Sequence, residues 1–108
     1  MASVDECREA LHRLAAQLDA KAANVDLDRS LVCRVTDLDV AFHGRLTGGR
    51  LVDIADGDDP RAKIKLTATS GDLVALLDGQ LDVAKAVAAR RVSLSASPFD
   101  LLKLRKLL

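Results

Sequence analysis

The stretch that decides the fold is AKIKLTATSGDLVALLDGQLDVAKA, residues 62–86. It opens with a run in which apolar and polar side chains alternate, so that Ile64, Leu66 and Ala68 share one side. Alternation of period two is typical of a strand that buries one face and exposes the other. The stretch therefore predicts a half-buried strand at residues 62–69.

Two short helices are predicted to follow this strand. Ser70 is placed to cap the first helix, with Asp72 in its first turn and Gly79 just past its end. Asp82 is placed to cap the second helix, which we expect to run to about Ala89. Residues 70–89 thus supply two helical elements that can cover the buried face of the strand.

The C-terminal segment carries the clearest helix start in the chain. Ser97 is a cap serine, Pro98 takes the first helical position, and Asp100 stands where a capping box needs an acid. We expect the leucines that follow to face inward as one stripe, namely Leu101, Leu104 and Leu108, with Leu102 and Leu107 widening it.

The N-terminal residues predict an amphipathic helix that ends near Asn24. Apolar side chains recur there at helical spacing, at Val4, Cys7, Leu11, Leu14 and Leu18. Residues 31–36, 39–46 and 91–96 return to period two and predict further strands. Clean alternation on several strands is typical of an antiparallel sheet that helices cover on one side only, which makes the protein α+β.

Two features shape the middle of the chain. Gly48-Gly49 separates two alternating runs and predicts a hairpin, since both central residues of a type I′ turn need positive φ. Past the turn we expect Val52 and Ile54 to share one face and Leu51 and Asp53 the other. The following ADGDDP, residues 55–60, predicts a turn, because its spacing does not fit a calcium loop.

Composition limits the class of protein. The 108 residues are 49% hydrophobic with zero formal net charge, which suits a single domain over residues 1–108 and lacks the positive charge that favours nucleic acid or anionic membrane. Aromatic residues make up only 2%, so base stacking is also disfavoured. No segment reaches membrane-spanning length and the start lacks a signal-peptide pattern, so we expect a cytoplasmic protein.

The sequence lacks the common catalytic and metal-binding motifs. It has no G-x-S-x-G, H-E-x-x-H or C-x-x-C, and His12 and His43 fall on different predicted elements. Cys7 and Cys33 are expected to be buried thiols that act as small hydrophobes. We therefore expect no enzyme activity, no bound metal and no cofactor.

Residues 62–104 resemble the sterol carrier protein type-2 domain family, a small lipid-transfer module. The strand followed by L-x-x-L-L-x-G resembles that family's pattern, and Gly79, Leu81, Asp82, Lys85 and Ala86 fall in register on its G-x-L-D-x-x-K-A motif. LKL at residues 102–104 resembles its C-terminal helix. The resemblance implies a five-stranded, mainly antiparallel sheet with helices on one face. It also implies a hydrophobic tunnel for a fatty acyl chain or sterol, with the C-terminal helix as a lid.

The sequence departs from that family at positions that shape the tunnel. Val83, Ala84 and Val87 stand where the family usually has Pro, Met and Phe. Arg90 replaces a usual glycine, and Asp100 occupies an apolar lid position. The tail RKLL is not a peroxisomal address, and the Ala, Arg, Asp and Leu bias points to a bacterial source. The smaller residues either enlarge the tunnel or let the helices close it.

Three interpretations stay open. In the first, the protein is non-enzymatic and binds a lipid-like ligand, with a lining of Leu73, Leu77, Leu81, Val87, Phe99, Leu101 and Leu104. In the second, the same residues fill the core or dock a protein partner, and the tunnel is closed. In the third, the chain assists a separately encoded enzyme, because this domain type is also appended to acetyltransferases and sulfatases. A homodimer through a sheet edge is compatible with the first two.

Overall fold

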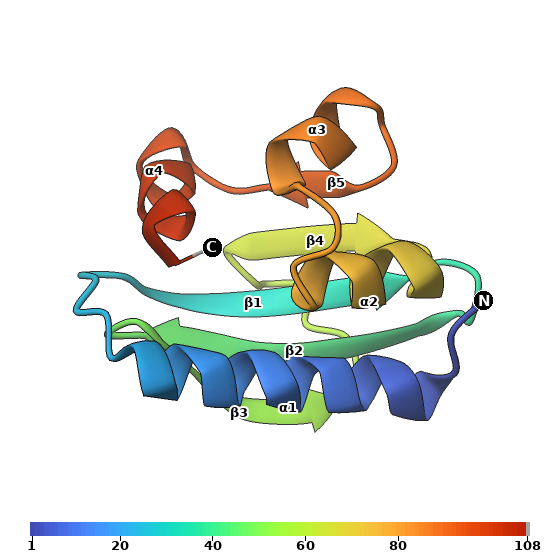
Figure 1. The fold of residues 1–108 in the computed structure, drawn as a ribbon, viewed down its shortest axis with the longest axis horizontal. Coiled ribbons are helices and arrows are strands. Elements are labelled where there is room, and N and C mark those ends of the chain that lie inside the picture. Colours follow the sequence, from blue (N-terminus) through green and yellow to red (C-terminus); the bar gives the residue numbers. More distant parts are fainter. Residues whose placement is uncertain (108) are drawn as a thin grey trace.

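The computed structural model describes residues 1–107 and contains one sheet with helices packed on one face (Figure 1). In chain order its elements are α1 (Val4–Lys21), β1 (Asp28–Val35), β2 (Val40–Thr47), β3 (Arg50–Asp56), β4 (Ile64–Ala68), α2 (Ser70–Leu77), α3 (Val83–Ala88), β5 (Ser93–Ser95) and α4 (Pro98–Leu107). The five strands lie in the order β3-β2-β1-β4-β5. This confirms the predicted α+β class and five-stranded sheet.

The sheet is mainly antiparallel with one parallel pair. β1 pairs antiparallel with β2, β2 with β3 and β4 with β5, whereas β1 and β4 run parallel. The chain must therefore cross β2 and β1 between the end of β3 and the start of β4, and residues 57–63 make this crossing on the face away from the helices. Arg34 pairs with Asp58 there, and the backbone amide of Lys63 donates to the Ser30 hydroxyl.

The crossing segment changes the character of the outer sheet face. Val32 alternates with Cys33, and so the predicted pattern places it on the solvated side, yet it is fully buried. Ala62 of the crossing segment is buried as well, and both residues lie outside the main core cluster. A loop that crosses this face excludes water from it, which the alternation of a single strand does not reveal.

The main core lies between the sheet and the helices. α1 packs against β3 and against α2, so these two helices share one layer over the sheet. α3 and α4 lie toward the β5 side of the molecule, with α4 near the end where β1 starts (Figure 1). The β1 residues Cys33 and Val35 and the β4 residues Ile64 and Leu66 all enter this core. The predicted ligand-binding residues of α2 and α4 also belong to this part of the molecule.

The turn between β2 and β3 confirms the predicted diglycine hairpin. Gly48 has φ of 58° and Gly49 has φ of 87°, both in the region that favours glycine. One residue placement beyond the turn is wrong. Asp53 adopts φ of 57°, and the β2–β3 register shifts between His43 and Arg45. This bulge turns Ile54 toward the core, on the same side as Leu51, instead of the side of Val52.

Two helix assignments also need correction. The cap of α2 is Thr69, whose hydroxyl accepts from the amide of Asp72, because the Ser70 side chain is engaged elsewhere. In α4 the buried leucines are Leu104 and Leu107, whereas Leu102 is 58% exposed. A stripe that includes position 102 is too wide for so short a helix at the margin of the sheet. The prediction for Leu108 lies outside the described residues.

Candidate functional site

The layer between the sheet and α2, α3 and α4 is the candidate site. Of the predicted lining residues, Leu73, Leu77 and Leu104 are buried in it. Leu81 and Leu101 are partly buried and pack against the same core. The structure therefore brings five of the seven residues to one apolar layer. The other two face solvent, since Val87 is 40% exposed and Phe99 is 77% exposed.

A buried serine fixes the start of α2. The Ser70 hydroxyl donates to a carboxylate oxygen of Asp37 at 2.6 Å, and the Ser70 amide donates to the other oxygen at 2.7 Å. The same hydroxyl accepts from the amide of Ala2 at 3.0 Å. Donation by Ser70 lowers the pKa of Asp37 below its usual value, because it stabilises the ionised carboxylate. Nothing in the sequence pattern of Ser70 or Asp37 indicates that they meet.

Polar contacts hold α4 at both ends. The Ser97 hydroxyl accepts from the amide of Asp100 at 3.2 Å, which confirms the predicted cap. Asp100 is 3% exposed, and its carboxylate pairs with Arg29 at 3.1 Å. At the other end the Lys21 ammonium donates to the carbonyls of Lys106 and Leu107 at 3.3 and 3.4 Å. Lys21 thereby satisfies acceptors that a helix end leaves free.

α3 is the least embedded helix of the layer. Its cap is Asp82, which accepts from the amide of Lys85 as predicted, but Ala86 is its only buried residue among those described. α4 contributes only Leu104, Leu107 and the ion-paired Asp100 to the buried set. Segments with few buried apolar contacts open at lower free energy than the rest of a fold. α3 is therefore the helix best able to move away from the sheet, whereas movement of α4 must also break its contacts with Arg29 and Lys21.

The apolar interior is closely filled in this structure. A cavity of about 10 Å³ lies between α1 and strands β1, β2 and β3. It is lined by Leu11, Leu31, Cys33, Phe42, His43, Gly44, Leu51 and Ile54. That volume is about the minimum that can hold one water molecule, and none of the seven predicted residues lines it. A cavity of this size cannot hold a hydrocarbon tail.

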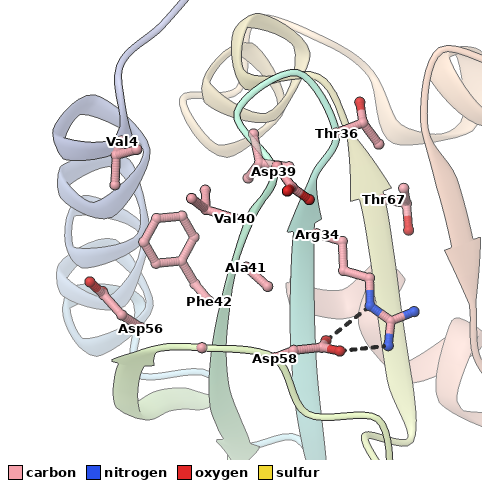
Figure 2. A pocket seen from close by; sticks show the side chains of 12 residues that line it. Val4, Arg34, Thr36, Asp39, Val40, Ala41, Phe42, Asp56, Asp58 and Thr67 are labelled. Carbon is pink, nitrogen blue, oxygen red and sulfur yellow. Dashed lines mark hydrogen bonds and ion pairs between the residues drawn. The ribbon is translucent and has the colours of Figure 1, made fainter.

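A larger cleft opens at the end of the sheet where β1 and β3 finish. Its volume is about 690 Å³, and Figure 2 shows its apolar wall of Val4, Val40 and Phe42 beside the ion pair of Arg34 and Asp58. The pair spans 2.9 Å and lowers the pKa of Asp58. No motif in the sequence predicts this cleft. The crossing segment forms part of its wall, and only the turn residues of that segment show a recognisable sequence pattern.

The metal-binding potential and the cysteines of residues 1–107 can be described directly. No group of three or more His, Cys, Asp and Glu residues there could hold a metal ion. Cys7 and Cys33 are free and buried, as predicted, and burial raises the pKa of Cys33 to about 12. Such a thiol stays protonated and unreactive at neutral pH. His43 places Nδ1 3.0 Å from the carbonyl oxygen of Gly57, which orients the ring toward the crossing segment.

No helix in residues 1–107 is long and apolar enough to span a bilayer.

Comparisons with known proteins give a family and a fold. A family model described as Alkyl sulfatase C-terminal matches residues 6–108. No curated protein matches the sequence. Among solved structures, the stereoselective inverting sec-alkylsulfatase Pisa1 from Pseudomonas sp. is 26% identical over 88% of this chain, with a TM-score of 0.68. This chain spans only 15% of that enzyme's length.

Two mosquito proteins match over nearly their whole length. Sterol Carrier Protein 2 Like 2 from Aedes aegypti is 16% identical, with 95% of this chain and 96% of that one covered and a TM-score of 0.70. Sterol Carrier Protein 2 from Aedes aegypti in complex with the C16 fatty acid palmitate is 20% identical, with 94% and 91% covered and a TM-score of 0.69. At these identities the likeness concerns the fold, and it confirms the predicted sterol-carrier-like architecture.

Proposed function

The chain belongs to the alkyl sulfatase C-terminal family, and from that premise we propose that it binds the hydrocarbon tail of an amphipathic ligand without catalysing a reaction. The binding place is the layer between the sheet and α2, α3 and α4, under the C-terminal helix. One relative is named a sec-alkylsulfatase and a fold neighbour was solved with palmitate, and both names point to an alkyl chain.

The chemistry of the layer supports an aliphatic ligand. The residues that face it are aliphatic, and residues 1–107 contain no buried side-chain nitrogen or oxygen without a hydrogen-bond partner. A hydrocarbon entering there leaves no polar group unpaired. Each buried methylene contributes about 0.8 kcal/mol, so about ten of them give roughly 8 kcal/mol, which exceeds the lower estimates of the cost of association.

The weak embedding of α3 and α4 is the observation that carries the proposal. In the closed layer Leu73, Leu77 and Leu104 contact other core side chains, and Leu81 and Leu101 lie at its margin. Outward movement of α4 would replace those contacts by contacts to the ligand. Val87 and Phe99 face solvent, so they do not line the layer in this form, and their contact with a ligand stays a prediction.

Titration of delipidated protein with a fluorescent fatty acid tests the proposal. Leu104 and Leu102 offer a matched pair, since they lie on opposite faces of α4, one buried and one 58% exposed. We expect Leu104→Phe to fill the layer and weaken binding several-fold, and Leu102→Phe to leave it unchanged, with circular dichroism to confirm that both variants fold. Absence of saturable binding by the wild-type protein would refute the proposal.

One alternative has an observation of its own. The closely filled interior and the buried Asp100 fit a protein-interaction module whose tunnel is permanently closed. Native mass spectrometry of the freshly purified protein separates the two, because a co-purified lipid is expected only for the binding protein. A sulfatase reaction is not proposed for this chain. A cytoplasmic location, a bacterial source and a homodimer stay predictions from the sequence.

A further inference from the structure

Exposed apolar side chains gather on α4. The large hydrophobic residues most open to solvent in residues 1–107 are Met1, Phe99, Leu102 and Val87, and two of the four belong to this helix. Phe99 and Leu102 are one turn apart and project from the surface that faces away from the core. Neither contributes to the folded core, so packing within the chain does not account for them.

The charges of α4 are sorted between its two faces. Its one acid, Asp100, is buried and pairs with Arg29, whereas Arg105 and Lys106 are exposed and Lys103 is partly so. None of these three cations pairs with a carboxylate within residues 1–107. The whole chain has zero net charge, yet the outward face of α4 is apolar and positively charged. Basic residues in a last turn also suit the helix dipole, but that role does not explain the apolar pair.

A neighbouring cleft adds to the positive character. It has a volume of about 620 Å³, lies beside the start of α4 and is lined partly by Ser97 and Asp100. Arg29, Arg45 and Lys63 also line it, and the two arginines are paired with Asp100 and Asp28. Lys63 has no carboxylate partner among the described residues, so this cleft at the start of α4 carries an excess positive charge.

We propose that the outward face of α4 docks on an anionic lipid surface. Phe99 and Leu102 would enter the boundary between headgroups and acyl chains, and Lys103, Arg105 and Lys106 would lie among the anionic headgroups, as in interfacial amphipathic helices. The inference extends the proposed function, because α4 is also the helix that must move to admit a hydrocarbon tail. Docking would place that helix at a source of such tails.

A single tryptophan makes the test direct. The chain contains no Trp, so Phe99→Trp places the only indole at a site that is 77% exposed. We expect its emission to shift to the blue on addition of vesicles of phosphatidylcholine with phosphatidylglycerol, and not with phosphatidylcholine alone. Salt should reverse the shift, because it screens exposed charges.

Matched variants in the same Phe99→Trp background assign the effect to α4. Leu102→Ser should weaken partitioning into anionic vesicles, and Arg105→Gln with Lys106→Gln should weaken it about fivefold per residue. The control pair, Arg61→Gln with Lys85→Gln, removes two exposed cations outside α4 and should change it much less. Equal losses in both pairs would show a general charge effect and overturn the proposal.

Further outcomes separate this inference from the proposed function. An absent shift, or an equal shift with neutral vesicles, overturns the docking proposal even where fatty acid titration stays intact. Sedimentation that shows a dimer dispersed by Leu102→Ser assigns the patch to a second copy and overturns it too. Loss of fatty acid binding with vesicle docking retained instead refutes the proposed function alone.

Discussion

Ser70 shows how one side chain can fix several segments. It is fully buried and joins the start of α2 to Asp37, in the turn after β1, and to the N-terminal Ala2. Ser70→Ala removes both hydroxyl bonds and leaves the Ala2 amide without its acceptor. We expect a loss of about 1–3 kcal/mol in the free energy of unfolding at pH 7, measured by urea titration.

That loss should depend on pH with a defined sign. The pKa of Asp37 is lowered in the folded protein, so its ionised form adds stability above the unfolded pKa, and this contribution fades as pH falls through the folded pKa. The difference between wild type and Ser70→Ala should therefore shrink below about pH 4. In an Asp37→Asn background the difference should stay constant with pH. A difference that grew in acid would contradict the role given to the carboxylate.

At the scale of elements, the β2–β3 hairpin offers two glycines for comparison. A Cβ at Gly48 meets no atom within 4 Å, whereas a Cβ at Gly49 would lie 2.1 Å from the Ala23 carbonyl oxygen. Both residues have positive φ, so each alanine variant carries backbone strain of about 1 kcal/mol. Gly49→Ala should cost a further 1–3 kcal/mol or so, because the clash involves backbone on both sides.

Thermal unfolding of the two variants checks this expectation. Gly48→Ala serves as the control for positive φ without a clash. Equal melting temperatures for the two variants would mean that the segment around Ala23 yields easily, and that the loop after α1 is not held against the hairpin.

The elements that the sequence predicts well are those governed by local pattern. Alternation at residues 62–69, the diglycine turn and the Asp82 and Ser97 caps depend on neighbours in the chain, and the structure agrees with all of them. The errors arise from distant contacts. The bulge at Asp53 and the burial of Val32 depend on strand pairing and on a crossing loop, which a single strand's pattern does not encode.

For the candidate site, too, local pattern predicts some residues correctly and distant contacts decide the others. Leu73, Leu77 and Leu104 lie on the inner faces of their helices, so helical spacing suffices to place them in the layer. Phe99 sits at the first turn of α4, where the angle between helix and sheet decides whether a side chain points inward, and it is 77% exposed. The family resemblance supplied the architecture, but the exposure of individual residues depends on how each helix docks.

At the scale of the whole molecule, the closed layer matters most. The radius of gyration is 12.6 Å, near the roughly 13 Å expected for a solid domain of this length. The described residues therefore form a compact domain. We expect a ligand to be accommodated by local movement of the helices, so that the free energy of opening the layer becomes part of the binding affinity.

Hydrogen exchange can locate that movement. Without ligand, we expect amides of α3 and α4 to exchange by local opening, well before those of β1 and β2, which are paired on both sides. A bound fatty acid should slow exchange in α2, α3 and α4 and leave α1 and β3 nearly unchanged, because only the former enclose the proposed layer. The Leu104→Phe variant, with the layer filled, should show no added protection. Protection confined to residues around the cleft of Val4, Val40 and Phe42 would place the ligand at the end of the sheet and contradict binding under α4.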